Sequence, residues 1–159
     1  METIEQKKRR LYGKQYLNEY FKELKALTNN EVYESDILSI SETDNIPNLS
    51  ISSKPSSKYN IEFQEKNKLL TLIDEVIQLK DGECFLFSSY SKDCGAMKLC
   101  SLANFNVNFN FDDEHSGIIT IISADFSNQI IFDFFIENHI QYLEIELYGN
   151  DWFKARILN

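Results

Sequence analysis

Two different spacings of apolar residues run through this chain. In residues 3–30 apolar side chains return every three or four positions, the pattern of one buried stripe on a helix, at Leu17, Tyr20, Phe21, Leu24 and Leu27. Thr3 followed by Gln6 has capping-box spacing, so the pattern predicts that the helix starts there. Gly13 costs such a helix about 1 kcal/mol relative to alanine, and we expect the turns before it to be looser. The same spacing predicts a second helix over residues 67–80.

Strict alternation of apolar and polar residues, typical of strands, dominates the rest of the chain. It is clearest over residues 104–111, where four asparagines alternate with Phe105, Val107, Phe109 and Phe111. This stretch predicts a strand with one solvent-facing side. Further strands are predicted over residues 59–63, 84–87, 118–123, 130–137 and 143–148. Turns are predicted at 91–96, 112–117, 125–128 and 138–139, and residues 152–158 predict a short strand or a helical turn.

The remaining stretch lies between the two predicted helices. Residues 31–40 predict one short strand. Residues 41–58, rich in serine and holding both prolines, predict a long loop in which Leu49–Ser52 could form a short edge strand. We therefore expect a single α+β domain over residues 1–159, in which an antiparallel sheet of about five to six strands, a C-terminal meander, is covered on one face by two helices. A chain of 159 residues is the usual size of one domain.

The overall charge of the chain limits the classes of partner that it can bind. Sixteen basic against 25 acidic residues give a net charge of −9 and a pI of about 4.7. Nucleic-acid binding needs a basic face, so no nucleic-acid partner is expected. The basic run Lys7–Arg10 fits the solvated face of a helix better than an arm for nucleic acid or membrane. We expect no membrane partner either, because no apolar run is long enough to span a bilayer.

Known catalytic and metal-binding patterns are not apparent. Cys94 beside Gly95 is the one candidate nucleophile, with His115 or His139 as a base, but no cysteine-hydrolase motif surrounds it. Residues 112–115 could hold a hard cation, yet they lack the glycine of a calcium loop. We therefore expect no enzyme, no metal and no cofactor. An odd count of three cysteines and the lack of a signal peptide indicate a reduced, cytoplasmic protein.

The acidic residues are concentrated in the C-terminal half. Residues 1–30 carry seven bases against four acids, whereas residues 81–159 carry twelve acids against four bases. Four of these acids occupy outward positions of two consecutive predicted strands: Asp133, Glu137, Glu144 and Glu146. If the strands pair, they form a carboxylate patch flanked by aromatic residues, which suits a protein interface with a basic partner. The alternative is an ordinary solvated face that discourages edge pairing.

A resemblance rests on the stretch Ile140-Gln141-Tyr142-Leu143-Glu144-Ile145-Glu146-Leu147-Tyr148-Gly149-Asn150-Asp151-Trp152 and on the acidic, single-domain character. In these the chain is similar to immunity proteins of bacterial toxin systems, including those of contact-dependent growth inhibition. The resemblance implies an inhibitor that binds a cognate toxin domain, often a basic nuclease, and blocks its active site or its substrate path. The expected partner-binding residues are Asp112, Asp113, Glu114, Asp133, Glu137, Tyr142, Glu144, Glu146, Tyr148, Asp151 and Trp152.

Two other classes of function stay open. One is a small-ligand-binding or thiol-dependent enzymatic domain, with a pocket lined by Phe105, Phe109, Phe111, Phe132 and Phe134. The other is an adaptor recognised through residues 41–58.

Overall fold

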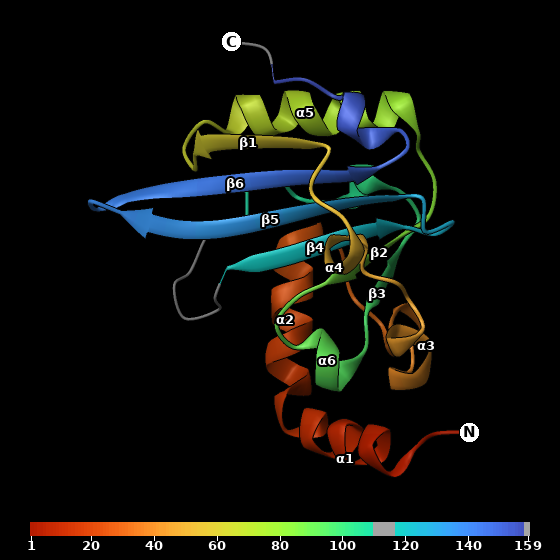
Figure 1. The fold of residues 1–159 in the computed structure, drawn as a ribbon. Coiled ribbons are helices and arrows are strands. Elements are labelled where there is room, and N and C mark those ends of the chain that lie inside the picture. Colours follow the sequence, from red (N-terminus) through yellow and green to blue (C-terminus); the bar gives the residue numbers. More distant parts are fainter. Residues whose placement is uncertain (110–116, 158–159) are drawn as a thin grey trace.

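The computed structural model describes residues 1–109 and 117–157, which form helices mainly in the N-terminal part and a six-stranded sheet that ends in a C-terminal meander (Figure 1). The strands are β1 Ser57–Glu62, β2 Cys84–Phe87, β3 Met97–Leu99, β4 Ile118–Ser123, β5 Asn128–Glu137 and β6 Ile140–Gly149. The α-helices are α1 Ile4–Gly13, α2 Leu17–Thr28, α3 Ile40–Asp44, α4 Leu49–Ser52, α5 Lys66–Leu79 and α6 Ser91–Cys94. Short 3-10 helices are η1 Lys14–Tyr16, η2 Glu34–Asp36, η3 Leu102–Asn104 and η5 Trp152–Lys154.

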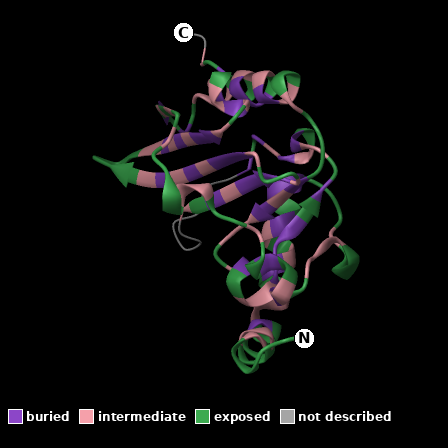
Figure 2. Cartoon of the chain, turned by 45° about the vertical axis from the view of Figure 1, so that its right-hand side comes forward, coloured by how far each residue is buried: buried purple, intermediate pink, exposed green. Residues whose placement is uncertain are grey.

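One antiparallel sheet holds all six strands in the order β1, β6, β5, β4, β2, β3. Strands β4, β5 and β6 form the predicted meander, and β1 adds to its free edge. Alternate residues of β5 and β6 face one side and pair across the strands, Phe132 with Ile145 and Phe134 with Leu143. Figure 2 shows the resulting alternation of burial along the strands.

Helices α2 and α5 bury one face of this sheet. Their apolar side chains join those of the strands in one core cluster, including Tyr20, Leu24, Leu69, Leu72 and Val76. The predicted α+β architecture, with a sheet covered on one face by two helices, is confirmed.

The strand predicted over residues 104–111 is wrong in its described part. Residues 102–104 form η3, and the chain then turns. Asn106 explains the difference, because its amide nitrogen donates to the carbonyl of Ala26 at 3.0 Å and its amide oxygen accepts from the backbone of Asn108 at 3.0 Å. Asparagine favours such turns over strands. The apolar residues of this stretch do face the core, since the ring of Phe105 stacks on that of Phe132 with centroids 5.2 Å apart. Phe111 lies outside the described residues.

Residues 31–58 also differ from their prediction. The expected strand over 31–40 is a 3-10 turn, followed by a single β-bridge between Ile37 and Met97. The expected loop over 41–58 holds most of α3, all of α4 and the start of β1, and the edge strand expected at Leu49–Ser52 is the helix α4. Both helices have side-chain N-caps: the Ser39 hydroxyl accepts from the backbone of Glu42, and the Asn48 side chain from that of Ser50.

The predicted N-terminal helix starts at its capping box but is divided after Gly13. This glycine packs against α6 so closely that an added Cβ would lie 2.1 Å from the carbonyl oxygen of Asp93. The chain passes through η1 before α2 begins. Gly13 is thus a close contact between α1 and α6 as well as a weak position in the helix.

Candidate functional site

The side of the sheet opposite α2 and α5 is here called the open face. Its side chains alternate with those of the core and come from five neighbouring strands. They include Lys58, Asn60, Glu62, Phe85, Phe87, Ile118, Thr120, Ile131, Asp133, Phe135, Glu137, Tyr142, Glu144, Glu146 and Tyr148. The short helix α4 is anchored near one end, where the backbone of Leu49 donates to the side chain of Gln129 at 2.7 Å.

Three carboxylates gather near the middle of the open face, and we call them the carboxylate cluster: Asp133, Glu144 and Glu146. Asp133 on β5 lies directly opposite Glu144 on β6. One cation reaches the cluster from the edge strand, because the Lys58 ammonium lies 3.0 Å from Glu144 and 3.5 Å from Glu146. The cluster therefore keeps an excess of negative charge even with its lysine in place.

The surroundings of the cluster change its proton affinity. Burial raises the pKa of the Asp133 carboxyl above its ordinary value, the charges of Glu144 and Glu146 add to the rise, and Lys58 opposes it. The hydrogen bond to Glu144 is the main reason that the pKa of Lys58 is raised. Tyr148, whose pKa burial also raises, donates its hydroxyl to Glu146 at 2.6 Å. These contacts hold Glu144 and Glu146 in defined positions.

Apolar and aromatic side chains flank the carboxylates. The rings of Phe135 and Tyr142 stack across β5 and β6 with centroids 5.4 Å apart. Ile118 on β4 leaves 55% of its surface exposed. Glu137 ends β5 beside the turn of the hairpin and is exposed. The open face thus combines charge with the kind of apolar area that protein interfaces use.

Two predicted partner-binding residues lie away from this face. Trp152 is only 3% exposed and donates its ring nitrogen to the carbonyl of Lys80 at 3.0 Å, so it belongs to the core. Asp151 accepts from the side chain of Asn128 at 3.1 Å. Both follow the end of β6, where strand alternation no longer tells which way a side chain points. The predicted residues Asp112, Asp113 and Glu114 lie outside the described residues.

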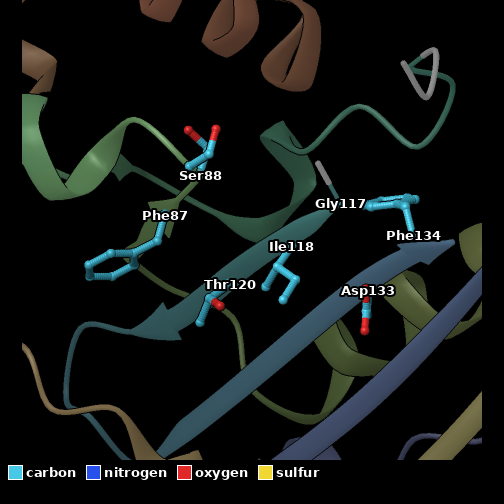
Figure 3. A pocket seen from close by; sticks show the side chains of 8 residues that line it. Phe87, Ser88, Gly117, Ile118, Thr120, Asp133 and Phe134 are labelled. Atoms are coloured by element: carbon cyan, nitrogen blue, oxygen red, sulfur yellow. The ribbon is translucent and has the colours of Figure 1, made fainter. Parts of the chain in front are cut away.

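An open hollow that no sequence pattern predicts lies beside the carboxylate cluster. It has a volume of about 470 Å³ and is lined by residues of β2, β4 and β5 and of the turns next to them (Figure 3). Phe87 lies opposite Thr120, and Ile118 lies opposite Asp133, so four side chains of the open face meet there. Alternation predicts on which face of the sheet each side chain lies. Only the strand order β5-β4-β2 brings these four side chains together. Lys58 could have been found, since it alternates with the predicted strand residues Tyr59 and Ile61.

Comparisons with protein-family models, with curated proteins and with solved structures find no match. The open face is therefore interpreted from its own geometry. Within the described ranges 1–109 and 117–157, no helix is long and apolar enough to cross a membrane. Nor do three or more His, Cys, Asp or Glu side chains of these ranges gather as metal ligands would.

The alternative site at Cys94 has unfavourable chemistry for a nucleophile. Its sulfur lies 3.4 Å from the carbonyl oxygen of Gly13, and burial raises the pKa of the thiol to about 11. A reactive cysteine needs the opposite shift, because the thiolate is the attacking species. Of its proposed bases, His139 lies in the exposed β5–β6 turn and His115 lies outside the described residues. Of the phenylalanines proposed to line a pocket, those in the described residues (Phe105, Phe109, Phe132 and Phe134) pack in the core, and the ring centroids of Phe109 and Phe134 lie 5.1 Å apart.

Proposed function

We propose that this chain is an immunity protein that binds a cognate toxin domain through the open face and neutralises it. The toxin domain that we propose is a nuclease of basic charge. The observation that carries the proposal is the carboxylate cluster, which stands on the face that α2 and α5 leave uncovered. In this proposal the protein acts in the cytoplasm by occupying the toxin, without catalysis, metal or cofactor.

The chemistry of the open face suits such a partner. A nuclease guides phosphate groups with basic side chains, and a row of carboxylates can take the place of those phosphates. Opposite charges speed the encounter, while buried aromatic anchors hold the complex once it has formed. Phe135 and Tyr142 lie next to the carboxylates and provide such anchors.

The direct test is protection from a toxin. Where a toxin-domain reading frame lies beside the gene of this chain, we expect the toxin domain alone to stop bacterial growth and co-expression with this chain to restore it. The two purified proteins should form a complex of one copy each. A toxin that stays fully active in the presence of an excess of this chain would refute the proposal.

Reversing two charges of the cluster locates the interface. We predict that Glu144→Lys/Glu146→Lys weakens binding to the toxin domain at least about tenfold, a loss of 1.4 kcal/mol, mainly by slowing association. Surface plasmon resonance measures both rate constants. The milder Glu144→Gln/Glu146→Gln variant gives the same direction of effect if the lysines disturb folding.

A matched control separates the interface from bulk charge. Glu19→Lys/Asp74→Lys makes the same change of net charge on exposed positions of α2 and α5, behind the sheet. Binding should stay within about twofold of the unmodified chain. Equal losses in both double variants would mean that net charge, not the open face, governs association.

A further inference from the structure

The hollow beside the carboxylate cluster has walls of two kinds. Phe87 on β2 and Ile118 on β4 provide apolar surface. Hydroxyl groups come from Thr120 on β4 and from Ser88 and Ser89 after β2. Asp133 on β5 is the one acidic residue in the lining. Figure 3 shows Ile118 and Thr120 in succession on β4, with Asp133 on the neighbouring strand and Phe87 across from them. The hollow is thus apolar over most of its wall and has one anionic side.

Lys58 acts on the anionic side of the hollow only from a distance, as a nearby charge that lowers the pKa of Asp133. Among the described residues, no hydrogen bond or ion pair joins the Asp133 carboxylate to another side chain, because Lys58 is engaged by Glu144 and Glu146. Those two glutamates make the surroundings of Asp133 more negative still. A carboxylate that is partly buried next to two others gains from a cation placed against it. A second cation placed against Asp133 would offset this negative charge.

The size and apolar walls of the hollow favour some cations over others. A free metal ion would leave the apolar walls unfilled, and a volume of about 470 Å³ has room for a long side chain. Arginine combines an apolar stem with a planar guanidinium that stacks on aromatic rings and grips a carboxylate with two hydrogen bonds. The lysine ammonium is a hydrated point charge and uses an aromatic wall less well.

We infer that the hollow receives one arginine side chain of the basic partner, with its guanidinium on Asp133 and its stem against Ile118 and Phe87. The inference rests on the proposed function and deepens it, because it names the anchor that the open face would recognise. The carboxylate cluster then draws the partner in, and the hollow fixes its register.

Small arginine probes test this without the toxin. In an NMR titration of the intact chain with Nα-acetyl-arginine amide, we expect saturable shifts of the backbone signals of Ile118, Thr120 and Asp133. A dissociation constant on the order of 1 mM is the scale for one side chain. The citrulline analogue has nearly the same shape without the charge and should give no saturable shift. The lysine analogue should bind several-fold more weakly than the arginine probe.

Variants check the assigned contact. Asp133→Asn should abolish the saturable response to the arginine probe, whereas Asp74→Asn on the exposed side of α5 should leave it unchanged. The inference is overturned if citrulline or lysine binds as well as arginine, if the shifts fall elsewhere, or if Asp133→Asn still binds. If the chain protects against its toxin but ignores the probe, only this inference fails. If the probe binds but no toxin is neutralised, the proposed function fails and the arginine site remains.

Discussion

Asp133 is a residue whose place on the open face costs the fold some stability. Its carboxyl pKa is raised by burial and by Glu144 and Glu146, so the folded state holds the proton to a higher pH than the unfolded chain does. The ionised form therefore destabilises the fold at neutral pH, and this cost disappears as the pH falls and the carboxyl is protonated in both states. A binding role for Asp133 would account for an ionisable side chain at this position.

We predict that Asp133→Asn raises the free energy of unfolding at pH 7 by less than about 1 kcal/mol, the scale of a partly screened surface charge. The gain should vanish near pH 3, below the ordinary pKa of an aspartate. Urea unfolding followed by circular dichroism at both pH values measures it. Asp74→Asn on the exposed side of α5 serves as the control and should change neither value. A loss of stability in Asp133→Asn at pH 7 would contradict this account.

Single residues also show which side-chain positions can be predicted from the sequence and which cannot. The outward positions of Glu144 and Glu146 followed from alternation alone, because β6 is regular over ten residues. Trp152 lies three residues beyond the end of that strand, in η5, where the period changes and no pattern states which side is buried. The hollow could not be predicted, since it depends on β2 lying beside β4 although the two strands are distant in sequence.

At the level of elements, periodicity is reliable only where the backbone can form the matching structure. The alternation over residues 104–109 was correct about burial, since Phe105, Val107 and Phe109 are buried, but wrong about the strand. The side chain of Asn106, between them, bonds to the backbone of Ala26 and Asn108 instead of standing on a free sheet face. The helices α3 and α4 were missed for another reason, because each is too short to show a helical period.

The β5–β6 hairpin offers a test at this scale. Its two turn residues, Asn138 and His139, have φ angles of 52° and 64°, the left-handed values that a two-residue hairpin turn needs at both positions. Asparagine and histidine adopt this conformation more often than most residues, but only glycine adopts it without a steric cost. We predict that His139→Gly raises the free energy of unfolding by about 0.5 kcal/mol, measured by urea denaturation. Gln141→Gly, within β6, should lower it, because glycine weakens a strand. A loss of stability in His139→Gly would mean that the histidine contributes more than its strain costs.

The molecule as a whole carries its charge unevenly. The basic N-terminal segment lies in α1 and α2, and α1 stands at the opposite end of the molecule from α5 and β1 (Figure 1). Exposed Lys7 and Lys8 on α1 are therefore separated from the carboxylate cluster by most of the molecule. At about 0.1 M salt, charges further apart than about 10 Å are largely screened from one another. The cluster should then attract a basic partner almost independently of α1.

This separation makes net charge and local charge distinguishable in one experiment. We predict that Lys7→Gln/Lys8→Gln, which makes the chain more acidic overall, changes the association rate with the basic toxin domain by less than about twofold at 0.1 M salt. Glu144→Gln/Glu146→Gln should lower that rate several-fold and flatten its dependence on salt, because the charges that steer the encounter are gone. Stopped-flow measurements from low to high ionic strength give both values. If Lys7→Gln/Lys8→Gln accelerates association as strongly as the glutamate variant slows it, the partner responds to the total charge of −9 and the open face has no privileged role in the encounter.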